Sequence, residues 1–293
     1  MLSYQTMEES IEVKQSFILS HFMPFPQNTL CMVSARGGIG KTNLSIKLAA
    51  EYTNYHDGNV SMWLTEDEAG NVKNRSETLK TFGIINEYDE NRVLLITDDP
   101  LHFAHSKGRD FDFDHDKLNE LKEFCCMYDV RLLIIDPLLA FFSGNENDNS
   151  QARIFMQPFI NWCKEVDITI IIIHHASKID GNTRGAGAFV DAVRCCYNVS
   201  IPLQETKSEK GIKIEEDEFK KSQGIRLVMC TKDNRGVTPI LYKLYNNDNF
   251  ETAIIPKITI DKIIGGIMNS KPIKQDFEEI EYEDEPIIEM SNI

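Results

Sequence analysis

The sequence predicts an α/β fold with a mostly parallel sheet that is covered by helices on both faces. Strand-like apolar runs alternate with segments of helical spacing, which is the pattern of a sheet built from crossover units. Two of the runs, 131–135 and 168–173, are apolar at almost every position, as strands buried on both faces are. With 293 residues the chain is long enough for one large α/β domain or two small domains.

The regular elements follow in order along the first part of the chain. Strands are expected at 29–34, 60–64, 93–96, 131–135 and 168–174. Helices are expected at 41–52, 71–82, 116–127 and 150–166. Pro158 should kink the last helix because it removes a backbone hydrogen bond. The strand at 168–174 is the most apolar, so we expect it near the centre of the sheet.

The second part of the chain has a different character. Its expected strands are short and have polar connections, which fits antiparallel additions to the sheet, at 194–201, 225–231, 240–245 and 252–255. The segment 204–222 is dense in Lys and Glu and is predicted to be an exposed, mobile hairpin or loop. A short helix is expected from about residue 258. These patterns predict an extension at 1–16, a core at 17–257 and a C-terminal segment at 258–293.

Composition narrows the class of protein. Hydrophobic residues make up 42% and charged residues 26%, as in ordinary soluble domains. No apolar run approaches the ~20 residues of a membrane helix, and the first residues lack the plan of a signal peptide. We therefore expect a cytoplasmic protein without a membrane partner. The seven cysteines form no C-x-x-C pair, so we expect reduced thiols and no zinc site.

The charge balance argues against a broad basic surface. The formal net charge is −15, which disfavours wide contact with nucleic acid but leaves room for a narrow basic channel. Many of the acids lie in 275–293, which we expect to be a disordered tail outside the fold. The alternatives are a docking peptide for a replication partner and a DNA mimic that restrains a basic channel.

A glycine-rich loop separates the first apolar strand from the first helix. Glycines tolerate dihedral angles that let the backbone N–H groups curl around a phosphate, and the helix N-terminus adds to this anion nest. Lys41 would reach the β- and γ-phosphates and the Thr42 hydroxyl would coordinate Mg²⁺. Ala35 stands where the G-x-x-x-x-G-K-[ST] pattern begins with glycine. We therefore expect a nucleoside triphosphate, ATP, at Ala35, Arg36, Gly37, Gly38, Ile39, Gly40, Lys41, Thr42 and Asn43.

Polar residues follow three of the other strands. Asp136 ends a buried strand, where a P-loop protein places its Mg²⁺-water ligand. Glu66 follows the strand at 60–64 and can polarise the attacking water, although Asp67 and Glu68 stand beside it. His174 and His175 end the strand at 168–174, as a γ-phosphate sensor or as capping residues.

The motifs form an ordered series that resembles a known family. They are Ala35 to Thr42, Trp63-Leu64-Thr65-Glu66-Asp67, Ile134-Ile135-Asp136-Pro137-Leu138, Glu146-Asn147-Asp148-Asn149, His174-His175-Ala176-Ser177-Lys178, Arg184-Gly185-Ala186, Val190-Asp191-Ala192-Val193-Arg194 and Lys232-Asp233-Asn234-Arg235-Gly236. Over about 17–245 the chain is similar to the RecA-fold ATPases of the RepA-type replicative helicase group, the small hexameric helicases of plasmid replication. The resemblance implies a RecA-like P-loop NTPase fold.

The resemblance also implies roles for individual residues. Glu66 matches the catalytic glutamate, Asp136 the Walker B aspartate, and His175 the histidine that couples the γ-phosphate to DNA loops. Arg194 matches an arginine finger that acts on the nucleotide of the neighbouring subunit, with a structural salt bridge as the alternative. Lys232 stands where related ring helicases carry a second cation that acts between subunits, but Asn234 replaces the arginine that often follows it.

The family's DNA-facing loop matches 177–184, with Lys178 and Arg184 as its basic residues. The resemblance thus implies a homo-hexameric ring that hydrolyses ATP with Mg²⁺ and moves along single-stranded DNA during replication of a plasmid or mobile element. The main alternative is a RecA-fold, DNA-dependent ATPase of recombination, repair or regulation that does not unwind duplex. A non-enzymatic scaffold and a small-molecule phosphotransferase are further alternatives.

Overall fold

The computed structural model describes residues 15–107, 110–175, 187–208, 211–218, 226–234 and 242–245. All of these residues belong to one compact unit, which spans Met1–Ile255. The expected extension at 1–16 lies mostly outside the described residues, and the C-terminal segment lies wholly outside them. Both boundaries therefore stay predictions.

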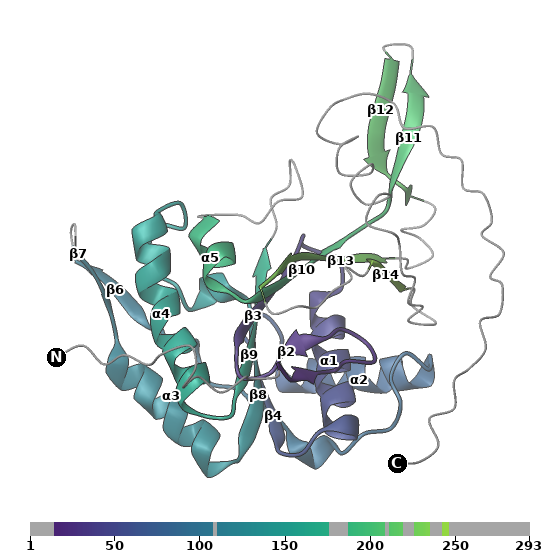
Figure 1. Ribbon diagram of the computed structural model, residues 1–293. Coiled ribbons are helices and arrows are strands. Elements are labelled where there is room, and N and C mark those ends of the chain that lie inside the picture. Colours follow the sequence, from purple (N-terminus) through teal and green to yellow (C-terminus); the bar gives the residue numbers. More distant parts are fainter. Residues whose placement is uncertain are drawn as a thin grey trace, which may run out of the picture. The chain divides into compact units, whose positions relative to one another are not determined.

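Within the described residues a central sheet of eight strands runs in the order β14-β13-β10-β3-β9-β8-β4-β5 (Figure 1). Six neighbouring strands, from β10 to β5, are parallel. β13 pairs antiparallel with β10, and β14 antiparallel with β13. The strands are β3 (Leu30–Ala35), β4 (Asn59–Leu64), β5 (Val93–Ile96), β8 (Val130–Asp136), β9 (Thr169–His175), β10 (Cys195–Ser200), β13 (Arg226–Asp233) and β14 (Tyr242–Tyr245).

Helices cover both faces of the sheet. Figure 1 shows α1 and α2 on one side and α3, α4 and α5 on the other. The helices are α1 (Lys41–Tyr55), α2 (Ala69–Thr81), α3 (His115–Met127), α4 (Asn149–Glu165) and α5 (Gly187–Ala192). Successive residues of β9 point to opposite faces, so that Ile171 and Ile173 join one hydrophobic cluster and Ile170 and Ile172 join the other. A strand buried on both faces therefore has an isoleucine at each of these four positions.

Short elements complete the described part. Three two-stranded pairs stand apart from the central sheet: β1 (Phe17–Ile18) with β2 (Phe25–Pro26), β6 (Ala104–Lys107) with β7 (Asp110–Phe113), and β11 (Leu203–Ser208) with β12 (Gly211–Glu216). The single-turn helices are η1 (Glu90–Arg92) and η2 (Leu138–Ala140). The pair of β11 and β12 confirms a hairpin in the region 204–222, where we expected a hairpin or loop.

The fold class is confirmed: the architecture is that of a RecA-like P-loop fold, with a mostly parallel sheet and antiparallel strands added at its C-terminal side. One expectation was wrong. The strand at 194–201 is not an antiparallel addition, because β10 runs parallel to β3 and only its outer neighbour β13 is antiparallel. The expected strand at 252–255 and the helix from about 258 lie outside the described residues.

Two further observations concern membrane-spanning helices and the state of the cysteines. Within the described ranges, no helix has both the length and the apolar character needed to cross a membrane. All seven cysteines are free thiols, six of them buried and only Cys126 exposed. Burial raises the pKa of the Cys31 and Cys125 thiols to about 12, so these side chains are inert small hydrophobes.

Candidate active site at the phosphate loop

The phosphate loop joins the end of β3 to the start of α1, at the carboxyl edge of the parallel strands. Gly38 and Gly40 have φ of 76° and 101°, in the left-handed region that favours glycine. Gly40 is the N-cap of α1 and offers no side-chain cap, and the first turn of the helix has no acidic residue. Among the described residues, no side chain caps the N–H groups at this helix start, which is the arrangement that binds phosphate.

Lys41, His175 and Glu66 form a chain of polar contacts beside the loop. The Lys41 ammonium lies 3.3 Å from His175 Nδ1, and His175 Nε2 lies 3.7 Å from a Glu66 carboxylate oxygen. An ammonium only donates, so Nδ1 accepts in this contact and the ring proton is on Nε2, facing Glu66. The end of β9 thus places one imidazole between the lysine of the loop and the carboxylate at the end of β4.

Thr42 lies next to a second carboxylate. Its hydroxyl donates to Asp67 Oδ2 at 2.9 Å, while the Arg75 guanidinium of α2 donates to Asp67 Oδ1 at 3.2 Å. Since the hydroxyl gives its only proton to Asp67, the lone pairs on the Thr42 oxygen stay available to a metal. Asp67 was one of three adjacent acids that the sequence left open, and the structure assigns it to Thr42.

Asp136 lies at the tip of β8 and is only 6% exposed. Burial raises the pKa of its carboxyl to about 7, with Lys41 opposing the rise and Glu66 and Asp67 adding to it. Its Oδ1 atom has no hydrogen-bond partner among the described residues. A buried carboxylate oxygen without a partner is costly unless a cation meets it, so Asp136 fits the expected Mg²⁺ ligand.

The site fits a magnesium ion whose coordination is completed by phosphate oxygens of a bound nucleotide. Within the described residues, no group of three or more His, Cys, Asp or Glu side chains is arranged to hold a metal. Mg²⁺ in nucleotide sites is commonly held by one or two protein ligands together with phosphate oxygens. Thr42 and Asp136 would supply the protein ligands here. Asn43 follows in the first turn of α1, where its buried Oδ1 has no partner among the described residues.

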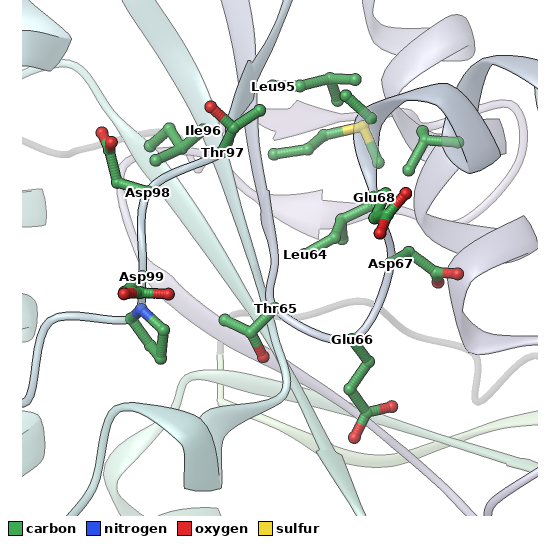
Figure 2. Close-up of a pocket in the computed structure, with 14 residues that line it drawn as sticks. Leu64, Thr65, Glu66, Asp67, Glu68, Leu95, Ile96, Thr97, Asp98 and Asp99 are labelled. Carbon is green, nitrogen blue, oxygen red and sulfur yellow. The ribbon is translucent and has the colours of Figure 1, made fainter.

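The three acids after β4 point in different directions. Figure 2 shows Glu66 extended away from Glu68 and from Asp98. Its side chain is 64% exposed and is the one of the three near His175. Together with Asp98, Asp99 and several apolar residues, the three acids line a cavity of about 300 Å³ between the ends of β4 and β5. Glu68 is the N-cap of α2 and makes no side-chain cap bond. The geometry therefore separates Glu66 from its two neighbours.

Arg194 lies at the opposite edge of the sheet. Its backbone N–H donates to the Leu30 carbonyl, at the amino end of β3. β3 has six residues, Leu30–Ala35, and the five intervals between them span about 17 Å at about 3.3 Å per residue. The Arg194 side chain cannot cross that distance to the loop of its own subunit. No ion pair among the described residues includes Arg194, so the alternative of a structural salt bridge finds no support in the described part.

Lys232 lies near Arg194 but has a different environment. Its ammonium donates to the Val190 and Asp191 carbonyls, at 3.0 and 2.7 Å, where α5 ends. Burial lowers the pKa of Lys232, and Arg194 adds to this effect. In this subunit Lys232 therefore joins β13 to α5. The expectation that it acts on the nucleotide of a neighbouring subunit stays a prediction.

The other side of the loop carries two contacts that sequence reasoning missed. The Arg36 guanidinium forms an ion pair with Glu216, the last residue of β12. Arg226, the first residue of β13, donates from Nε to the Ile39 carbonyl at 3.0 Å. Both partners come from the antiparallel part of the fold, more than 170 residues further along the chain, and no local motif marks them. The basic loop with Lys178 and Arg184 and the acidic tail at 275–293 lie outside the described residues.

Comparison with family models identifies a match over part of the chain. Residues 22–181 match the AAA domain, which is more than half of the chain. The matched range includes the phosphate loop, Glu66, Asp136 and His175, but ends before Arg194 and Lys232. A search of curated proteins finds no match.

Proposed function

The chain belongs to the AAA-domain family of P-loop ATPases, and on this premise we propose that it is a ring-forming DNA helicase of the RepA type. The proposal has three parts: ATP hydrolysis at the phosphate loop, assembly of subunits into a ring, and movement along single-stranded DNA in the replication of a plasmid or mobile element. Its place in the cell would be the cytoplasm.

The observation that carries the proposal is the contact chain from Lys41 through His175 to Glu66. A nucleoside triphosphate on the loop would bring its γ-phosphate to Lys41, and so to the imidazole beside it. Glu66 is the exposed end of the chain and would take a proton from the attacking water as general base. His175 also ends its strand directly before the segment that resembles a DNA loop. The same residue therefore contacts the hydrolysis site and adjoins the expected DNA site.

The remaining polar residues would position the triphosphate. Thr42 and Asp136 would hold Mg²⁺, which shields phosphate charge and favours attack on the γ-phosphorus. Asp67 orients the Thr42 hydroxyl, and Arg75 holds Asp67 in place. The open N–H groups at the start of α1 would bind the phosphate oxygens.

The position of Arg194 supports a ring. An arginine finger neutralises charge on the transferring phosphoryl group. In this subunit Arg194 lies at the amino edge of the sheet, near Leu30, while its own phosphate loop lies at the carboxyl edge. Action on a nucleotide therefore requires a second subunit, and hydrolysis would depend on assembly.

The test combines three measurements on the full chain. We expect Mg²⁺-dependent ATPase activity that single-stranded DNA stimulates, a ring in the presence of ATP and DNA by mass measurement, and displacement of a strand from a forked duplex. Glu66→Gln should abolish hydrolysis and spare nucleotide binding, whereas the matched change Glu68→Gln should leave both intact. A strict monomer would refute the ring. ATPase activity without strand displacement would favour the alternative of a DNA-dependent ATPase that does not unwind.

A further inference from the structure

The phosphate loop is held from two sides, and its second side has no part in the proposed chemistry. β3 lies between β9 and β10 in the sheet. On the β9 side are the groups for hydrolysis, and on the β10 side are Glu216 and Arg226. Arg36 and Ile39 are both loop residues, so the antiparallel part of the fold contacts the loop at two points.

The contact at Arg36 is a point of electrostatic conflict. Glu216 belongs to a run of four acids, Glu215-Glu216-Asp217-Glu218, that adjoins a loop suited to a polyanion. The side chains of Arg36 and Glu216 are 33% and 25% exposed, so water screens their charges only in part. A triphosphate that enters the loop attracts the guanidinium and repels the carboxylate. An arginine guanidinium binds phosphate oxygens as readily as it binds a carboxylate. The triphosphate can therefore replace Glu216 as the partner of Arg36.

The Glu216 carboxylate is also connected to a separate structural unit. The hairpin of β11 and β12 forms its own two-stranded sheet, and Figure 1 shows it extending away from the central sheet beyond the end of β10. The Asp217 N–H donates to the Pro202 carbonyl at 2.8 Å, which closes the base of the hairpin next to Glu216. A change at Glu216 therefore acts at the point where both strands leave the body of the fold.

We propose that the ion pair between Arg36 and Glu216 is a latch that holds the base of the β11–β12 hairpin at the phosphate loop and opens when a nucleoside triphosphate binds Arg36. Glu216 is then a positioning residue that competes with the nucleotide, and the hairpin reports whether the loop is filled. Arg226 contacts the loop separately, by donating from its Nε to the Ile39 carbonyl. The inference rests on the proposed binding of nucleotide at the loop.

The experiment measures amide hydrogen exchange in β11 and β12 of the full chain, empty and with Mg²⁺ and a slowly hydrolysed ATP analogue. Nucleotide affinity is measured on the same samples. In the native protein we expect slow exchange in the empty state and faster exchange with the analogue. Glu216→Gln should give fast exchange in both states. It should also tighten nucleotide binding about two- to fivefold, the range of a partly exposed ion pair, with little change in kcat.

Two further variants make the test specific. Glu165→Gln breaks the exposed ion pair between Glu165 and Lys122, far from the loop, and should behave as the native protein in every measurement. Arg36→Gln should free the hairpin in both states, as Glu216→Gln does, but should weaken nucleotide binding. Opposite effects on affinity from the two partners of one ion pair distinguish a latch from a general loss of stability.

The outcomes separate the latch from the proposed function. Equal hairpin exchange in the native protein and in Glu216→Gln, both without nucleotide, would overturn the latch whatever the protein binds. Hairpin exchange that does not change when the analogue is bound would also overturn it. Absence of any nucleotide binding would refute the proposed function and the opening step together. In that case faster exchange in empty Glu216→Gln would still establish that the ion pair holds the hairpin.

Discussion

Replacement of Asp136 by Asn should stabilise the empty protein, and the gain should depend on pH. Burial raises the pKa of this carboxyl from 3.8 to about 7 in the folded state. A raised pKa means that stability is fully present below pH 3.8 and is lost as the pH rises through about 7. The shift corresponds to about 4 kcal/mol at about 1.4 kcal/mol per pKa unit, and the 6% exposure of Asp136 leaves little solvent screening. Asparagine has the same shape and does not ionise.

Urea unfolding at pH 5 and pH 8, with a chelator and without nucleotide, measures this difference. Relative to the native protein, Asp136→Asn should gain about 1–2 kcal/mol of unfolding free energy at pH 5 and about 3–4 kcal/mol at pH 8. Asp116→Asn, a change in the exposed first turn of α3, should show no such dependence on pH. Equal effects of Asp136→Asn at the two pH values would refute the claim that the buried carboxylate is ionised at a cost. The same variant should lose Mg²⁺-dependent tightening of nucleotide binding.

Three other substitutions test the rest of the site. His175→Gln should lower kcat about tenfold or more and change nucleotide affinity little. Steady-state ATP hydrolysis measures kcat, and binding of an ATP analogue measures the affinity. Arg194→Ala should keep nucleotide binding and lower turnover about 10³-fold, and mixing it with Glu66→Ala subunits should restore part of the activity in a ring; no recovery at any mixing ratio would remove the finger assignment. Gly40→Ala should cost about 1–3 kcal/mol in unfolding free energy because φ is 101° there, whereas Gly187→Ala, in open space without a positive φ, should cost little by the same urea titration.

The local sequence pattern was sufficient for most of the fold. Each parallel strand is marked by an apolar run and each large helix by its spacing, so that most of the expected ranges agree with the observed ones within two or three residues. The direction of β10 was not predictable in this way. Its six residues follow a short helix, and whether such a strand runs up or down depends on where the chain crosses the sheet, which α5 determines by packing on α4.

The site residues that the sequence could predict are those marked by a local motif, and those brought in from distant parts of the chain were missed. Residues at strand tips were found because the carboxyl ends of parallel strands meet at one edge, which brought Glu66, Asp136 and His175 to Lys41. The role of Asp67 was missed because three adjacent acids differ only in the direction of their side chains, and that depends on how the chain turns into α2. Glu216 and Arg226 were missed because an antiparallel hairpin brings them to the loop from a region without a motif.

Burial of the Asp136 carboxyl costs folding free energy, and the proposed binding of a metal–nucleotide pair at the loop explains why this acid stands there. In the empty site a carboxyl with a pKa of about 7 is partly protonated at neutral pH, and its Oδ1 has no partner among the described residues. Mg²⁺ bound together with a nucleotide would favour the ionised form of Asp136, so the carboxyl group would release its proton on binding. Part of the binding energy would thereby be used to ionise a buried acid, which would lower the affinity of the site for the metal–nucleotide pair. The Arg36–Glu216 contact would add a second cost on the other side of β3, since a bound phosphate would have to replace an ion pair that is already formed.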